Sequence, residues 1–170
     1  MPTVLDVVLV LMIIQGAIGA FDVFYNHEWE ARLPSLPSAA LELRIHSVRA
    51  ILYAFVFGGV AWFNWLGMFA WLFVAVLAVE IALTLWDFVV EDQTRRLSAL
   101  ERIVHTVLAM NGGAYVGMLI YEMYLNWLPA QTSLQFVSRG WISIVLSAYA
   151  IGVLVSGIRD GRASARLAVA

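Results

Sequence analysis

The amino-acid sequence predicts an all-α integral membrane protein with five transmembrane helices. Of its 170 residues, 62% are hydrophobic and only 13% are charged, whereas a soluble domain carries about 25% charged residues. Five apolar segments have about the length, roughly 20 residues, that a helix needs to cross a bilayer. Prolines, short polar turns or charged stretches separate them. The length favours a single membrane domain, residues 1–170, without a separate soluble domain.

The predicted spans cover, in order, about residues 4–25, 40–63, 66–90, 99–121 and 140–158. Pro34 and Pro37 break the chain after the first span, because proline cannot make the backbone hydrogen bond of a helix interior. The second break, at Asn64 and Trp65, is so short that spans two and three should form an antiparallel hairpin. A charged break precedes the fourth span, and a break that contains a proline precedes the fifth.

Arginine placement predicts the orientation. All ten basic residues are arginines, and five spans place nine of them on one side of the membrane: Arg32, Arg44, Arg49, Arg95, Arg96, Arg102, Arg159, Arg162 and Arg166. Only Arg139 falls on the opposite side. The positive-inside rule therefore predicts a cytoplasmic C-terminus and an external N-terminus, and we expect the protein in a bacterial inner membrane. The net charge of −2 does not indicate nucleic-acid binding, and the lack of cysteine excludes disulfides and thiolate-ligated metals.

The first four spans show the pattern of an internal duplication, residues 4–63 and 66–121, and the fifth (140–158) is predicted to be an accessory helix. With a shift of 65 residues, Gln15, Asp22, Asn26 and His27 align with Glu80, Asp87, Glu91 and Asp92. With a shift of 59 residues, Glu42, His46, Ser47 and Gly58 align with Glu101, His105, Thr106 and Gly117. We therefore expect two helical hairpins that form a four-helix bundle about a pseudo-two-fold axis.

The repeats carry matched ionisable residues, which are costly inside a membrane and usually functional. A Glu and a His lie four residues apart in span two and again in span four, so each pair shares one helix face. An Asp lies near the end of spans one and three, on the side where spans two and four begin. We expect all of these groups near the cytoplasmic face. The predicted metal ligands are Asp22, Glu42, His46, Asp87, Glu101 and His105, with Glu91 as the seventh.

Carboxylates and imidazoles without sulfur suit iron or manganese, with zinc as a third candidate. Since carboxylates can bridge two cations, we expect two metal ions, with iron as the first choice. The pattern resembles the ligand set of soluble di-iron and di-manganese bundles, in which two helices each supply a Glu and two supply Glu-x-x-His. Here the single carboxylates are Asp, the pair spacing is i+4, and the resemblance covers six positions. Glu80, Asp92 and His27 are secondary candidates, which could act as extra ligands, orienting partners or proton carriers; the position of His27 favours a loop residue.

These residues favour a small membrane metalloprotein, an oxidase or oxygenase that oxidises a lipid-soluble substrate. The expected partners are the lipid bilayer, a hydrophobic small molecule or quinone, an electron-donor protein and further copies of the chain. The pattern assigns no catalytic residue.

Two other functions and a structural interpretation remain open. His46 and His105 lie at matched heights and could be the axial ligands of a haem b. The acidic cluster could instead serve a transporter or a membrane assembly factor as an ion or proton relay. In a structural interpretation, Glu101 belongs to a capping box with Ser98, the histidines are hydrogen-bonded in the core, and the two aspartates pair with arginines.

Overall fold

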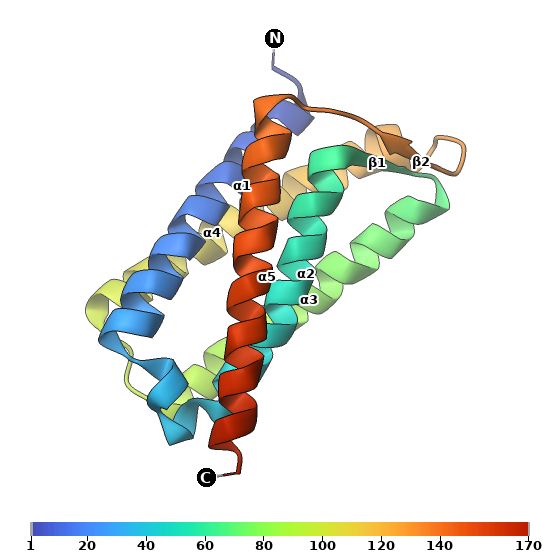
Figure 1. The fold of residues 1–170 in the computed structure, drawn as a ribbon. Helices are drawn as coiled ribbons and strands as arrows, with labels where there is room; N and C mark the ends of the chain where they lie inside the picture. The colour runs from blue at the N-terminus through green and yellow to red at the C-terminus, as the bar shows by residue number, and fades with distance from the viewer. Residues whose placement is uncertain (1, 170) are drawn as a thin grey trace.

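The computed structural model describes residues 2–169 and contains five long helices (Figure 1). They are α1 (Val4–Phe21), α2 (Ala40–Trp62), α3 (Met68–Thr94), α4 (Ala99–Glu122) and α5 (Trp141–Leu167). All five are long and apolar enough to cross a membrane, as the sequence predicts. The two ends of the chain lie at opposite ends of the molecule (Figure 1).

Two of the helices extend beyond their predicted ends, and both of these extensions lie at the charged end of the molecule. The first helix continues beyond α1 as a π-helix, η1 (Asp22–Glu30), and only then does the chain turn. The last helix reaches Leu167, nine residues beyond the predicted end at 158. The final turns of α5 are charged, so the apolar pattern used to predict the spans did not include them. Arg159 in these turns pairs with Glu28 of η1, with Nη2 2.6 Å from Oε1.

The chain between η1 and α2 forms two short 3₁₀ helices, η2 (Leu33–Ser35) and η3 (Pro37–Ala39). A proline occupies one of the first two positions of each, where a missing N–H is tolerated. Arg32, just before η2, adopts a left-handed backbone with φ of 51°. This sharp bend confirms the predicted break and returns the chain toward α2.

A small two-stranded sheet corrects the expectation of a purely helical protein. Strand β1 (Phe63–Leu66) follows α2 and pairs antiparallel with β2 (Ser133–Phe136), so that Phe63 lies opposite Phe136. A third helix extension, the π-helix η4 (Met123–Trp127), leads from α4 toward β2. The Asn64–Trp65 turn is therefore part of a strand, as its aromatic neighbours favour. Trp62 stacks on Phe136 with ring centroids 5.6 Å apart.

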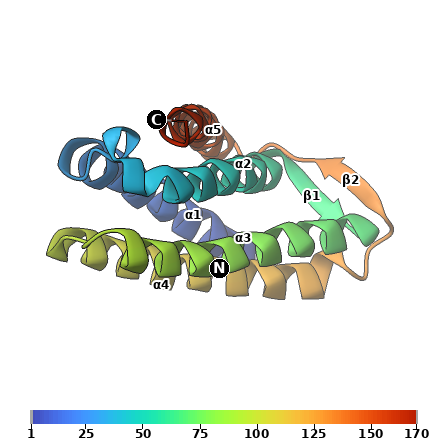
Figure 2. The same ribbon diagram turned by 90° about the horizontal axis from the view of Figure 1, so that it is seen from below.

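The closest helix packing joins α2 with α5, α1 with α4, and α2 with α3. Within residues 2–169, neither α1 with α2 nor α3 with α4 is among the closely packed pairs. Helix α5 lies against α2 on the side away from α3 and α4 (Figure 2). Gly157 permits this contact, because a Cβ there would overlap that of Ala50 and lie 3.2 Å from the carbonyl oxygen of Ser47.

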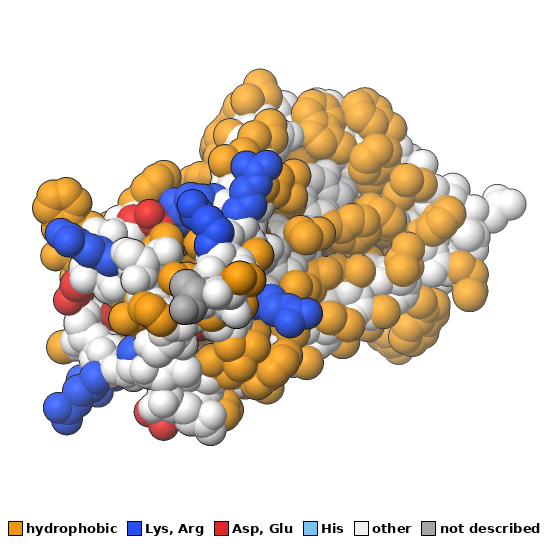
Figure 3. All heavy atoms as spheres, turned by 60° about the horizontal axis from the view of Figure 1, so that its bottom comes forward, with side chains coloured by type: hydrophobic (Ala, Val, Ile, Leu, Met, Phe, Trp, Pro, Cys, Tyr) orange, Lys and Arg blue, Asp and Glu red, His pale blue; other side chains and the backbone are white. Residues whose placement is uncertain are grey.

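Hydrophobic side chains cover most of the visible surface, and charged side chains gather at one end of the molecule (Figure 3). Many of the large exposed side chains are apolar, including Met110 at 71% exposure and Ile144 at 67%. Contiguous exposed apolar surface of this extent indicates contact with lipid. The charged end is where the connections from η1 to α2 and from α3 to α4 lie, and where the chain ends.

The contact of α5 with α2 gives a stability prediction. Replacing Gly157 with Ala should lower the thermal unfolding temperature in detergent, because overpacking costs about 1–3 kcal/mol. Gly152→Ala is the matched control on the same helix, since nothing lies within 4 Å of a Cβ at that position. Equal unfolding temperatures for the two variants, followed by circular dichroism, would contradict the close approach of α2 and α5.

Candidate metal centre

The charged end of the molecule holds a compact cluster of buried carboxylates and histidines. Glu42 is fully buried, Glu91 is 1% exposed and Glu101 is 3% exposed. They come from α2, α3 and α4 respectively, and η1 supplies Asp22 and His27, which are also buried. Buried carboxylates are rarely unpaired, so the partners of each group determine what the cluster can bind.

Two histidine–aspartate pairs cross between the two halves of the chain. His46 of α2 lies with Nε2 3.1 Å from Oδ2 of Asp87 on α3. His105 of α4 lies with Nε2 3.2 Å from Oδ2 of Asp22 at the end of α1. An aspartate beside Nε2 orients the ring and leaves Nδ1 as the nitrogen that can bind a metal. The sequence matched these four residues by repeat position, and the structure pairs each histidine with the aspartate of the other half.

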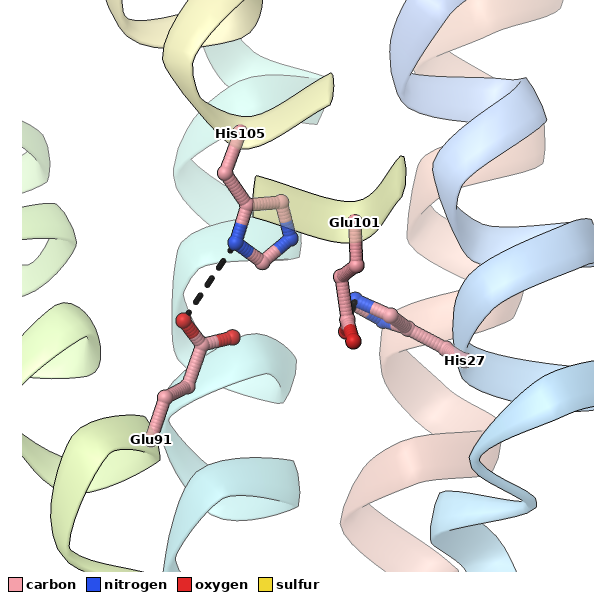
Figure 4. A group of neighbouring side chains, drawn as sticks. All are labelled: His27, Glu91, Glu101 and His105. Carbon is pink, nitrogen blue, oxygen red and sulfur yellow. Dashed lines mark ion pairs between the residues drawn. The ribbon is translucent and has the colours of Figure 1, made fainter. Parts of the chain in front are cut away.

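Two groups of side chains could each hold a metal ion. The ligand atoms of His27, Glu91, Glu101 and His105 lie within 4.8 Å of one another, and their side chains point toward one another (Figure 4). The ligand atoms of Glu42, His46 and Glu91 form a second such group. Glu91 belongs to both groups. Of the seven predicted ligands, five are members: Glu42, His46, Glu91, Glu101 and His105. Asp22 and Asp87 belong to neither group and contact the histidines instead.

His27 joins the cluster because η1 is a π-helix. On an α-helix, a residue five positions after Asp22 would point about 140° away from it, whereas the i→i+5 hydrogen bonds of a π-helix bring it back to the same face. Its Nε2 lies 3.5 Å from Oδ2 of Asp22 and 3.8 Å from Oε1 of Glu101. Its ring stacks on that of His46 at 4.8 Å and meets that of His105 edge-on.

Three buried atoms of the first group have no hydrogen-bond partner among the described residues. They are His27 Nε2, Glu91 Oε2 and His105 Nδ1. The last two lie 3.4 Å from each other as an ion pair (Figure 4), which is longer than an ordinary hydrogen bond. Nearly all buried polar atoms in folded proteins are paired with protein or water. Three such atoms in one group, all of types that ligate metals, fit a cation that contacts them together.

Arg95, in the loop between α3 and α4, reaches into the cluster. Its Nη2 donates to Oε1 of Glu42 at 2.8 Å and to Oε1 of Glu101 at 2.7 Å, and lies 3.5 Å from Glu91. Burial lowers the pKa of this guanidinium, but hydrogen bonds with Glu101 and Glu42 outweigh it and raise the pKa above its ordinary value. Sequence reasoning used Arg95 only to set the orientation, because no periodicity relates a loop residue to three helices.

A second arginine extends the network toward Glu80, at the middle of α3. Arg49 of α2 pairs with Asp87 through Nη1, and its Nη2 lies 3.5 Å from Oε1 of Glu80. Thr84 donates to Glu80 at 2.7 Å. In the other half, the equivalent of Glu80 is Gln15, which accepts from Asn111 at 2.7 Å. Glu80 is therefore part of a chain that leads through Arg49 and Asp87 to His46.

The cluster carries an excess of negative charge. Six carboxylates are buried here: Asp22, Glu42, Glu80, Asp87, Glu91 and Glu101. Arg49 and Arg95 are the guanidiniums that pair with them. In the state that can bind metal, in which the histidines are neutral, the formal charge is minus four. Comparison with protein-family models, curated proteins and solved structures finds no match for this chain.

The arginine between the carboxylates gives a second prediction. Arg95→Gln should destabilise the metal-free protein by about 3–5 kcal/mol, because it leaves buried carboxylates without their partner. Arg96→Gln is the matched control, since Arg96 is the next residue and is exposed. Unfolding of both variants would be followed with a chelator present. Equal stability would show that Arg95 does not neutralise the cluster.

Proposed function

We propose that the chain is a small membrane metalloprotein with a dinuclear carboxylate–histidine centre, an oxidoreductase that acts on a lipid-soluble substrate. The observation that carries the proposal is the sharing of Glu91 between two ligand groups. A carboxylate has two oxygens and can contact a metal with each. His27, Glu101 and His105 would complete one metal site, and Glu42 and His46 would complete the other.

The donor set supports a choice of metal. All of the ligand atoms are carboxylate oxygens and imidazole nitrogens, a combination that suits iron or manganese, with zinc as an alternative. Asp22 and Asp87 would hold His105 and His46 in the required tautomer from behind. Partners of this kind commonly change metal affinity by about 10–100-fold.

The charge of the cluster supports two divalent ions. A formal excess of four negative charges inside an apolar environment costs several kcal/mol for each unpaired ion, and two divalent cations would neutralise it. Arg95 holds Glu42 and Glu101, one carboxylate from each group. We propose that it keeps the carboxylates together before the metals bind and then shares or releases them.

The setting of the cluster supports a substrate that arrives from the bilayer. Phe88 stacks near His105 with ring centroids 6.1 Å apart, and Phe88 is 36% exposed on the apolar surface. Phe21 and Tyr25, also exposed, stack on each other near the end of α1. An apolar molecule could therefore reach the cluster without entering water. When bound, a pair of iron or manganese ions would supply the redox chemistry, and an electron donor would complete the reaction.

The membrane topology is part of the proposal. We propose that the charged end, with nine of the ten arginines, faces the cytoplasm of a bacterial cell and that the N-terminus lies outside. The crossed pairs of His46 with Asp87 and His105 with Asp22 support a pseudo-two-fold relation between the first two and the next two helices. A bundle built in this way would place equivalent residues around Glu91.

The same geometry supports a metal centre better than a haem b. Haem ligation would require an open slot beside each axial histidine. The ring of His46 is instead stacked on that of His27, and both His46 and His105 use Nε2 toward an aspartate. The surrounding carboxylates have no role in holding a haem.

The third prediction tests the shared ligand. Protein purified in detergent and loaded with Fe(II) or Mn(II) without oxygen should bind about two ions. Glu91→Gln should lose most of both, whereas His27→Ala should weaken only one site. Glu122→Gln is the matched control, a buried carboxylate on α4 that accepts from Asn126 and lies outside both groups. A folded wild type without metal, or a Glu91→Gln protein that retains two ions, would contradict the proposal.

A further inference from the structure

A surface hollow at the start of α4 lies outside the candidate metal centre. It has a volume of about 510 Å³ and is lined by the connection from Asp92 to Leu97 together with Arg102. Arg95 forms part of its wall but is already bound to Glu42 and Glu101. Three charged side chains of the lining are exposed and could contact a ligand: Asp92, Arg96 and Arg102. Within residues 2–169, the two arginines make no ion pair.

A second hollow adjoins the first one on the outer face of α4. It has a volume of about 380 Å³ and is lined by Ala99, Arg102, Ile103, Thr106 and Val107. Arg102 is common to both hollows. Ile103 is 61% exposed and Val107 is 42% exposed, so this second hollow presents apolar side chains to the bilayer.

We infer that the two hollows together bind one phospholipid with an anionic headgroup. The headgroup phosphate would lie in the first hollow, where two guanidiniums without an ion pair outnumber one carboxylate. An acyl chain would follow Ile103 and Val107 along α4. Basic pockets beside transmembrane helices on the cytoplasmic side suit anionic lipids in this way. A soluble phosphate would use only the first hollow, so the apolar continuation favours a lipid.

The charge balance favours a lipid with a single negative charge. Arg96 and Arg102 against Asp92 leave one positive charge to be neutralised, which a phosphodiester with an uncharged head alcohol supplies. A zwitterionic lipid would bring its own positive group close to the guanidiniums, so its electrostatic free energy of binding would be less favourable. Phosphatidylglycerol should therefore bind more tightly than phosphatidylcholine with the same acyl chains.

Native mass spectrometry of delipidated protein in detergent tests this site. Wild type should retain one phosphatidylglycerol with a preference of about tenfold or more over phosphatidylcholine, and the Arg96→Gln/Arg102→Gln double variant should lose that preference. Arg162→Gln/Arg166→Gln is the matched control, because it removes two exposed charges from α5 at the same end of the molecule. Ile103→Ser tests the groove and should weaken lipid binding without changing the helical content.

Three outcomes would overturn the inference. Equal loss of binding in the two double variants would indicate nonspecific attraction by surface charge. Unchanged binding in Arg96→Gln/Arg102→Gln would place the lipid elsewhere. Inorganic phosphate that raises the unfolding temperature as much as the lipid does, with no effect of Ile103→Ser on lipid binding, would show a phosphate site without an acyl groove. The experiment does not depend on the metal centre.

Discussion

The burial of six carboxylates at one end of an apolar helix bundle is the constraint on which the rest of the structure depends. Carboxylates removed from water require partners, and the chain supplies Arg49, Arg95 and three histidines. They come from four parts of the chain: His27 from η1, His46 and Arg49 from α2, Arg95 from the loop after α3, and His105 from α4. This need for partners explains why the side chain of Arg95 is directed into the cluster, where it pairs with Glu42, Glu91 and Glu101.

The scaffold meets this constraint by crossed pairing. Helix α1 packs on α4 and α2 packs on α3, so the His46–Asp87 and His105–Asp22 pairs each join the two halves of the chain. The fifth helix contributes none of the candidate ligands, but it packs closely on α2 and reaches η1 through Arg159 and Glu28. It therefore supports the helix extension that carries His27.

Sequence periodicity predicted the contacts that follow from a regular α-helix. It missed those that depend on helix pairing, on a π-helix or on a strand. The i+4 spacing placed Glu42 with His46 and Glu101 with His105, since a helical face follows from spacing alone. It could not show that the two aspartates contact histidines of the other half, because helix pairing is a tertiary property. It placed His27 only among secondary candidates, because its position depends on a π-helix. The sheet between β1 and β2 joins segments about 70 residues apart in the sequence. Local sequence patterns do not show which distant segments will pair, so the sheet was not predicted.

The most direct test of the dinuclear centre is an anomalous X-ray diffraction map of metal-loaded crystals, recorded on both sides of the iron absorption edge. The account predicts two peaks, one between Glu91 and the His27–Glu101–His105 group and the other between Glu91 and the Glu42–His46 pair. A single peak, or metal only on surface residues with Arg95 still bound to Glu42 and Glu101, would contradict it.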